Sequence, residues 1–563
     1  MFRLLFGRFA RCFLLLFALL FFVQLNEAQT APKRRRAISV KKSPKADEKK
    51  DEKKSNADAA ESAKPTAKGR LPVIIIPGLI GSELRNKDGD KVWFNLRRAK
   101  GDDLRLPVSP NLKDNKDGLI VGDILRRFKV LPLTPDIQIY SKLVDSLQKD
   151  GYVEGKIDAP DANGYADTFY VFPYDWRLDN VENAQLLLKK LDDLRAKLNR
   201  PNLKFNIVAH SMGGLIARYA ALYGNADLTE VKPHPTWRGA SYINSISLIA
   251  TPNGGATAAL NSLLKGFSLF GGGKLNIPFI QKITKFDIFT IPSVYQLLPH
   301  AGAVRAFDSH LRPLKIDIYD PETCEKYGWA AYTDPDFNKN FEVGEQIQAK
   351  AYFRAVLHRA KLFQAALDAK PAIRDPIPTY YLGSECKQTV NGFIVRQNAK
   401  KDRWETEFGS PSFTRADGTK VSDKQTRKLL NAPGDGVVPE SSLLYSYQKL
   451  GRLRNPRSGV LINDITISCD EHNRLTGNPV IDSNLMSILG NSIPETNPPK
   501  LVKPENAVKS RARNRGRTTR RIVKRKSWKQ PGISIFFFDR TRFFTICSGR
   551  NLLCGSFARI IIF

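Results

Sequence analysis

The feature that most constrains this chain is an apolar strand pattern that runs into a turn of small residues and then a helix. Residues 204–209, KFNIVA, have the apolar character of a strand, and residues 214–222, GLIARYAAL, have helical spacing. Between them lies AHSMGG at 209–214. Small residues two before and two after a serine permit the sharp strand-to-helix turn that exposes a nucleophilic hydroxyl. The segment predicts a nucleophile elbow with Ser211 at its tip; the alternative is a tight turn without chemistry.

Apolar runs and helical periodicities alternate through the middle of the chain. Unbroken apolar runs are typical of strands that are buried on both faces of a parallel sheet. The alternation predicts an α/β fold with a mostly parallel central sheet flanked by helices. Besides the elbow, we expect strands at 71–77, 168–172, 245–250, 378–383 and 459–462, a helix at 180–198, and a cap insertion at about 255–370 that includes a helix at 345–369.

A serine hydroxyl needs a base to act as a nucleophile. In folds with this elbow the chain order is serine, acid, histidine, with the histidine on a loop after the last strand. Of the six histidines only His472 fits, with an exposed loop histidine as the alternative. His210 adjoins the serine, but on such a turn its ring should point away. The others fall in expected loops or in the cap: His234, His300, His310 and His358.

The acid is expected between the serine and the histidine. Asp435 lies in NAPGDGVVP at 431–439, where it is flanked by glycines and followed by two valines. We expect it to orient the histidine. The alternative is the Gly-Asp-Gly turn of a hairpin, and Asp464 and Asp470 are rival acids.

An oxyanion would need two backbone N–H donors. The turn PGLIGS at 77–82 follows the first expected strand, and its glycines allow a close approach to a reacting carbonyl. We expect the N–H groups of Leu79 and Met212 to be the donors; the alternative for residues 77–82 is a purely structural turn. The sequence has no CxxC and no His/Cys cluster, so we expect no metal and no cofactor.

Together these pieces resemble the lecithin:cholesterol acyltransferase family, which includes phospholipid:diacylglycerol acyltransferases and lysosomal phospholipases, all α/β-hydrolases. The resemblance spans roughly residues 70–490. It implies a triad of Ser211, Asp435 and His472, with Leu79 and Met212 at the oxyanion hole. The motifs that carry it are PGLIGSEL at 77–84, PYDWR at 173–177, AHSMGG at 209–214, TPNGG at 251–255, GDGVVP at 434–439 and DEH at 470–472.

By this resemblance the protein moves a fatty acyl group from a phospholipid ester, through an acyl-serine, to an alcohol. If water is the acceptor, the enzyme is a lipase or phospholipase. The resemblance implies a lipid ester substrate at a membrane or lipoprotein-like surface. A different class of function is a non-catalytic hydrolase scaffold that binds a polyanion through basic ends. Within PYDWR, a structural or pocket-lining role is expected for Tyr174, Asp175, Trp176 and Arg177.

The sequence departs from the family in its cysteines. Well-known members carry a disulfide-closed, membrane-contacting hairpin after the first strand, but residues 85–130 contain no cysteine. We therefore expect the membrane contact on the apolar part of the cap at 263–289, including Phe267 and Phe270. Between residues 71 and 502 the cysteines are three in number, so at most one bridge forms among them: Cys324, Cys386 and Cys469.

The net charge of +33 belongs mainly to the two ends of the chain. Residues 1–70 carry +10 and residues 503–563 carry +14, whereas residues 71–502 carry only +9. The middle is therefore an ordinary, mildly basic globular segment. We expect no nucleic-acid partner for it.

Five parts of the chain follow from these patterns. In residues 1–28, three arginines precede an uncharged run at 12–23 that is shorter than the ~20 residues of a membrane helix, which favours an export signal over an uncleaved anchor. We therefore expect a protein that is secreted, periplasmic or attached to the cell envelope. The other parts are a disordered basic tether at 29–70, the hydrolase domain at 71–490, a basic linker at 491–530 and an atypical apolar tail at 531–563.

The two basic segments have alternative readings. In the tether, Arg34–Arg36 could form a nucleic-acid or nuclear-targeting patch. Residues 503–563 form either a basic arm that binds anionic lipid head groups, or a disordered extension, or a misread end of the gene.

Overall fold

The computed structural model covers the hydrolase domain in eight stretches. The described residues are 69–95, 103–128, 137–229, 233–267, 283–371, 376–398, 402–446 and 464–491. The chain divides into two units, 1–64 and 65–563, and every described residue lies in the second. Several expected features lie outside the described residues. They are the signal or anchor, nearly all of the tether, the linker, the tail, Phe270 and the strand at 459–462.

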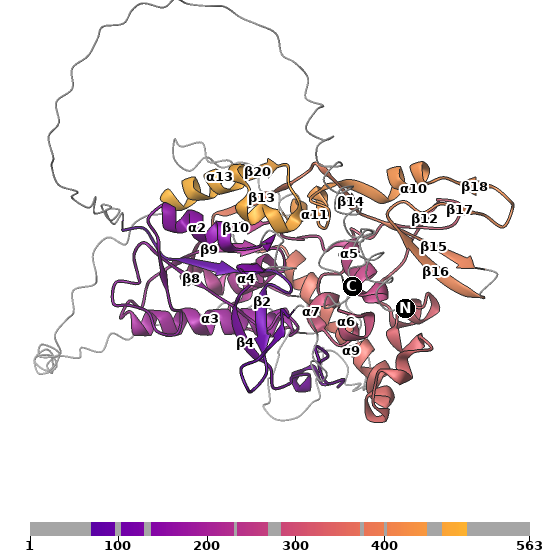
Figure 1. Ribbon diagram of the computed structural model, residues 1–563, viewed down its shortest axis with the longest axis horizontal. Coiled ribbons are helices and arrows are strands. Elements are labelled where there is room, and N and C mark those ends of the chain that lie inside the picture. The colour runs from indigo at the N-terminus through magenta and orange to yellow at the C-terminus, as the bar shows by residue number, and fades with distance from the viewer. Residues whose placement is uncertain are drawn as a thin grey trace, which may run out of the picture. The chain divides into compact units, whose positions relative to one another are not determined.

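A central sheet of seven strands, all paired in parallel, forms the frame of the domain (Figure 1). The α/β architecture expected from the sequence is confirmed, and the sheet is that of an α/β-hydrolase. The strands expected at 71–77, 168–172, 204–209, 245–250 and 378–383 are all present in it. In spatial order the strands are β20 (Ile465–Ser468), β13 (Thr379–Ser384), β10 (Ile243–Ile249), β9 (Phe205–His210), β1 (Val73–Ile76), β8 (Thr168–Val171) and β7 (Val153–Gly155).

Helices cover both faces of the sheet, which explains why β1 is apolar throughout. Successive side chains of a strand point to opposite faces. Ile74 and Ile76 belong to the hydrophobic cluster that includes α3 (Asn180–Lys197) and α4 (Met212–Tyr223). Val73 and Ile75 belong to the cluster that includes α2 (Ser141–Lys149) and α13 (Pro479–Gly490). Figure 1 shows α2 and α13 on one side of the strands and α3 on the other.

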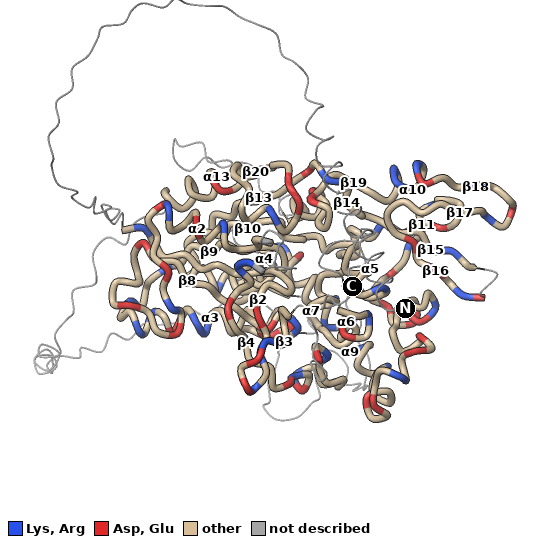
Figure 2. Tube along the Cα trace, in the orientation of Figure 1, with Lys and Arg blue, Asp and Glu red and all other residues tan. Residues whose placement is uncertain are grey.

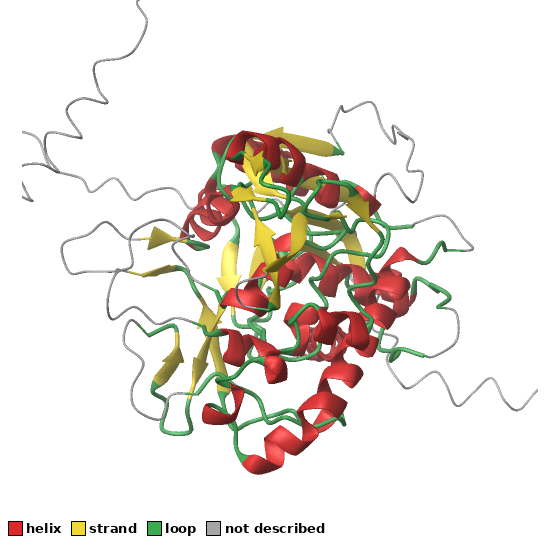
Figure 3. Ribbon diagram, turned by 90° about the vertical axis from the view of Figure 1, so that its right-hand side faces the viewer, coloured by secondary structure: helices red, strands yellow, loops and turns green. Residues whose placement is uncertain are grey.

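The described part of the segment between β10 and β13 is mainly helical. Figure 3, in which the right-hand side of Figure 1 faces the viewer, shows many helices in red beside the strands. The helix expected at 345–369 is α9 (Val343–Asp368). It is preceded by α5 (Thr257–Lys265), α6 (Lys285–Phe289), α7 (Pro292–Tyr295) and α8 (Pro321–Lys326). Aromatic rings of the segment between β10 and β13 pack on one another: Phe289 contacts Phe337, Phe341 and Phe353.

The side chains at 263–289 that were expected to contact a membrane are largely buried where the structure describes them. Leu263, Phe286 and Phe289 have exposed fractions of 8%, 8% and 1%. Among the described apolar residues of this segment, Leu264 and Phe267 are partly exposed. The apolar character of these described residues therefore reflects packing inside the domain, because the rings cover one another.

A second sheet joins two segments that the sequence analysis treated separately. Its order is β12 (Pro313–Leu314), β11 (Ala306–Phe307), β15 (Phe393–Asn398) and β16 (Arg403–Phe408). β11 pairs with β15 across more than eighty residues. Next to it, β14 (Lys387–Val390) pairs with β19 (Asn431–Gly434). The expected cap at about 255–370 is thus connected to a further excursion after β13 that the sequence did not predict.

Charge is distributed evenly over the described part of the chain. Figure 2 shows basic and acidic residues interspersed along it, without a stretch of one sign. This agrees with the small net charge of residues 71–502. Among the described residues, no helix is both long and apolar enough to cross a membrane.

Candidate active site

Ser211 occupies a strained turn between β9 and α4. Its backbone has φ 53° and ψ −125°, a conformation that is rare for residues other than glycine. The turn leaves no space for side chains beside it. A Cβ on Gly213 would lie 2.4 Å from the carbonyl oxygen of Pro77, and one on Gly214 would lie 2.0 Å from Oγ1 of Thr251. The start of α4 therefore packs closely against the ends of β1 and β10. Gly213 and Gly214 permit this contact, and Thr251 of TPNGG lies on the β10 side of it.

Ser211, His472 and Asp435 form a continuous chain of hydrogen bonds. Nε2 of His472 is 2.9 Å from Oγ of Ser211, and Nδ1 is 2.7 Å from Oδ2 of Asp435. A carboxylate can only accept, so Nδ1 carries the proton and Nε2 is free to accept from the serine. The structure brings these three expected residues together. It places the rivals elsewhere: the carboxylate of Asp470 accepts from Asn478, and Asp464 precedes β20, whereas His472 follows that strand.

Asp435 is buried and held as an anion. Its carboxylate accepts from the N–H groups of Val437 at 2.9 Å and Val438 at 2.7 Å, in addition to His472. Burial by itself would raise the pKa of Asp435, but the facing His472 and these N–H donors outweigh it and lower the pKa below its usual range. The Gly-Asp-Gly segment is indeed a tight turn, since Gly434 bridges to Pro439, but the turn serves to present the acid.

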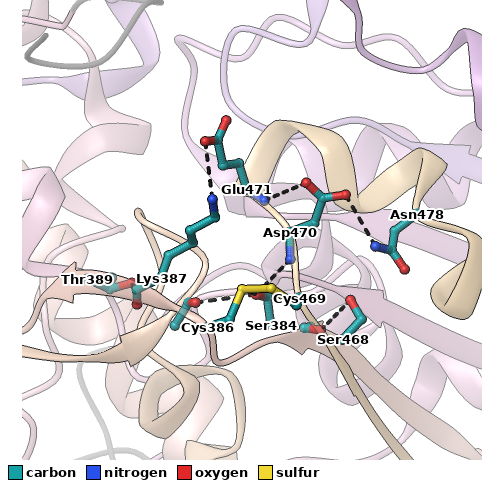
Figure 4. The surroundings of a disulfide bond; sticks show 11 residues. Ser384, Cys386, Lys387, Thr389, Ser468, Cys469, Asp470, Glu471 and Asn478 are labelled. Carbon is teal, nitrogen blue, oxygen red and sulfur yellow. Dashed lines mark hydrogen bonds and ion pairs between the residues drawn. A yellow bond between two sulfur atoms is a disulfide. The ribbon is translucent and has the colours of Figure 1, made fainter. Parts of the chain in front are cut away.

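The loop that carries His472 is tied by a disulfide to the segment between β13 and β14. Cys469, three residues before the histidine, is bonded to Cys386, which directly precedes β14 (Figure 4). Cys324 is free and buried. Ser384 lies beside the bridge: its Oγ accepts from the N–H of Asp470 at 3.2 Å and donates to the carbonyl of Gly434 at 3.3 Å. The loops of the acid and the histidine are therefore held at the same point.

The turn at 77–82 lies directly against the serine. A Cβ on Gly78 would lie 2.8 Å from Cβ of Ser211, so only glycine fits there. The N–H of Gly81 donates to the carbonyl of Gly78 at 3.0 Å, which closes the turn around Leu79. Met212 is the first residue of α4, where N–H groups have no acceptor within the helix. Of the two expected donors, Met212 directly follows Ser211 in the chain, and Leu79 follows Gly78, which lies against Ser211.

The PYDWR segment at 173–177 contacts the turn at 77–82 through a hydrogen bond of Tyr174. The hydroxyl of Tyr174 donates to the carbonyl of Pro77 at 2.8 Å. Arg177 is fully buried and pairs with Asp175 at 2.8 Å and with Asp117 at 2.5 Å. Trp176 is also fully buried, and its carbonyl accepts from Ser293. These contacts join the turn to the 103–128 segment and to α7.

The sequence did not predict the contacts of two residues near the serine. The ring of His210 does point away from the hydroxyl of Ser211, but it lies against the loop of the other histidine, with Nε2 3.2 Å from the carbonyl oxygen of His472. Nδ1 of His210 is 2.9 Å from the hydroxyl of Tyr140. Nothing in the spacing of Tyr140 signals this contact, because it is separated from His210 by seventy residues.

Within the described residues, no group of three or more His, Cys, Asp or Glu could hold a metal ion. The hydrogen-bonded chain at Ser211 uses side chains alone. The arrangement is that required for nucleophilic attack by an activated serine on a carbonyl.

Residues 123–355 match the family model described as lecithin:cholesterol acyltransferase. This part of the chain is therefore similar to that family. The lecithin:cholesterol acyltransferase match includes Ser211 but ends before Asp435 and His472. Lecithin-cholesterol acyltransferase-like 4 of Arabidopsis thaliana is 24% identical over 254 residues, which cover 40% of this chain and 42% of that protein. The chain thus spans less than half the length of this relative.

Solved structures with low sequence identity are also similar. A chain of the Tle4–Tli4 complex has 12% identity and a TM-score of 0.44, and the match covers 75% of this chain and 99% of that one. The mature Bacillus licheniformis lipase BlEst2 has 12% identity and a TM-score of 0.26, with 77% and 96% covered. Phospholipase PlaB from Legionella pneumophila has 15% identity and a TM-score of 0.19, with 46% and 37% covered.

Proposed function

We propose that this protein transfers a fatty acyl group from a phospholipid ester to an alcohol through an acyl-serine on Ser211. The observation that carries the proposal is the hydrogen-bonded chain Ser211–His472–Asp435 beside a glycine turn. The relation to the lecithin:cholesterol acyltransferase family supports a lipid ester as the substrate.

The first half-reaction acylates the serine. His472 accepts the hydroxyl proton of Ser211 through Nε2 while Oγ attacks the ester carbonyl. The oxyanion is stabilised by the N–H groups of Leu79 and Met212, each of which contributes about 3 to 4 kcal/mol to the lowering of the barrier. The imidazolium is stabilised by Asp435 and gives its proton to the oxygen of the departing lysophospholipid.

The second half-reaction repeats these steps with an acceptor. His472 removes a proton from the alcohol, whose oxygen attacks the acyl-serine, and the proton returns to Ser211. With water in place of the alcohol the product is a free fatty acid, and the protein is then a phospholipase. Ser211, His472 and Asp435 would catalyse acyl transfer and hydrolysis in the same way. Which acceptor reacts depends on which molecule enters the site and on how well water is excluded from it.

The proposal is tested on the full chain and a Ser211→Ala variant. Each is incubated with phosphatidylcholine vesicles that carry a labelled acyl chain, with and without a sterol or diacylglycerol, and the products are identified by mass spectrometry. A labelled ester of the alcohol that disappears in Ser211→Ala is expected. Ser487→Ala, an exposed serine on α13, is the matched control and should behave as the parent.

Two results would count against the proposal. Labelled fatty acid without labelled ester would overturn acyl transfer to those alcohols in favour of hydrolysis. No product from the parent protein, together with salt-sensitive binding of a polyanion, would favour the non-catalytic scaffold.

A further inference from the structure

A second hydrogen-bonded chain runs behind Ser211. It begins at the N–H of Gly78, which donates to the hydroxyl oxygen of Tyr140 at 2.8 Å. The hydroxyl of Tyr140 lies 2.9 Å from Nδ1 of His210, and Nε2 of His210 lies 3.2 Å from the carbonyl oxygen of His472. The two side chains, Tyr140 and His210, have exposed fractions of only 1% and 6%. The chain thus connects the glycine turn to the backbone of His472 through the interior.

Each hydrogen bond of this second chain has only one direction available. A carbonyl oxygen only accepts, so Nε2 of His210 carries a proton and donates to His472. Burial, and secondly the neighbouring His472, lowers the pKa of His210 to about 3, so the ring is neutral and Nδ1 has no proton. Nδ1 therefore accepts from the hydroxyl of Tyr140. Burial raises the pKa of Tyr140, which keeps that hydroxyl protonated.

We infer that Tyr140 and His210 are positioning residues that fix the backbone of His472 relative to the turn of Gly78 and Leu79. This deepens the proposed function and rests on it. The disulfide and Asp435 hold the loop of His472 from the other side. The second chain adds a contact through the residue that precedes the nucleophile, so that the base, the nucleophile and the candidate oxyanion donor are fixed to one another.

The neutrality of His210 is part of this role. His472 becomes a cation when it accepts the proton of Ser211, and the ring centroids of His210 and His472 are 5.0 Å apart. A second cation at that distance would oppose the proton transfer. The groups that face His210 are Tyr140, His472 and the carboxylate of Asp435, which is more distant. A neutral imidazole supplies a donor and an acceptor without adding a charge.

The test compares Tyr140→Phe, His210→Phe and His210→Gln in the full chain. Tyr140→Phe removes one hydroxyl, and His210→Phe keeps a ring without hydrogen bonds. Glutamine offers one N–H donor and one carbonyl acceptor, which can replace both contacts of the imidazole. The matched control is Tyr170→Phe, because Tyr170 is equally buried and its hydroxyl donates to the carbonyl of Gly164, away from the site. The readouts are kcat, KM and melting temperature with labelled phosphatidylcholine vesicles.

We expect kcat to fall about 10- to 100-fold in Tyr140→Phe and in His210→Phe, with little change in KM, because a small misplacement of the base slows proton transfer. His210→Gln should restore most of kcat. The double variant Tyr140→Phe/His210→Phe should lose no more than His210→Phe alone, since both residues act in one chain.

Three results separate the inference from its alternatives. Parent-like kcat in Tyr140→Phe and His210→Phe would overturn it while leaving the proposed function intact. A loss of kcat in Tyr170→Phe as large as that in Tyr140→Phe, in step with melting temperature, would show a merely structural role and also overturn it. An inactive parent protein would instead overturn the proposed function on which the inference rests.

Discussion

At the scale of single residues, the site depends on contacts that tolerate no added atom. A non-glycine residue with a positive φ, such as Ser211, costs on the order of 1 to 3 kcal/mol and persists only where the surroundings impose it. Gly78 and Gly213 provide those surroundings, because each approaches a neighbour more closely than a Cβ would allow. The hydroxyl is thereby fixed next to Nε2 of His472 before a substrate arrives.

The first prediction concerns Asp435. In Asp435→Asn the amide can donate to Nδ1 of His472, which then holds its proton on Nε2 and cannot accept from Ser211. We expect kcat to fall about 10³- to 10⁴-fold with little loss of fold. Single-turnover acylation by a chromogenic ester measures it. Asp470→Asn is the control, since that carboxylate contacts Asn478 instead of His472; a variant Asp435→Asn that keeps a tenth of the parental rate would contradict the role of the acid.

At the scale of elements, the acid and the base arrive on strands of different sheets. Asp435 follows β19, which pairs only with β14 among the described strands, whereas His472 follows β20 at the edge of the central sheet. The bridge between Cys386 and Cys469 fastens β14 to the loop after β20. It therefore holds together two loops that no strand pairing in the described residues connects directly.

The second prediction follows from that bridge. Replacing Cys386 and Cys469 by serine should lower the free energy of unfolding by about 2 to 4 kcal/mol and also lower kcat, because the loop of His472 gains freedom. Both cysteines are exposed, so dithiothreitol should produce the same loss in the parent. Denaturation and activity are measured with Cys324→Ala as the control for the buried free thiol. Full activity of the reduced protein would show that the loop is held without the bridge.

At the scale of the whole molecule, folding is coupled to the protonation of the buried site. The pKa of His210 is about 3 in the folded protein against about 6.5 for an unperturbed histidine. The unfolded chain therefore binds more protons than the folded one between these values. The stabilisation is fully present above pH ~6.5 and is lost as the pH falls toward ~3. The lowered pKa of Asp435 acts in the same direction at the acidic end.

The third prediction is the resulting pH dependence. Between pH 6.5 and 4.5 the free energy of unfolding of the parent should fall by about 1 kcal/mol per pH unit through His210 alone. Urea denaturation at a series of pH values should show a shallower dependence for His210→Gln, because the glutamine side chain does not titrate. Equal slopes for the two proteins would mean that His210 is protonated in the folded state as readily as in the unfolded chain.

The sequence by itself determined the features of the protein that depend on residues close to one another in the chain. Some patterns involve only residues that are close in sequence, and such patterns predict local structure. They are the apolar run of β1, the helical spacing of α3 and α9, and the small residues of the elbow. The order of Ser211, Asp435 and His472 could also be read from the sequence, because each follows a strand pattern or a glycine turn.

Only the tertiary structure decided which distant segments meet. Three cysteines left three pairings open, and the fold selected Cys386 with Cys469 because β14 and the end of β20 lie together. The pairing of β11 with β15 and the contact of Tyr140 with His210 have no local signature. The apolar residues at 263–289 were expected at a surface, but the described ones are largely buried, since burial depends on what packs against a residue and not on its own hydrophobicity. Such contacts follow from the order of strands in the sheet, which brings together residues that sequence spacing cannot relate.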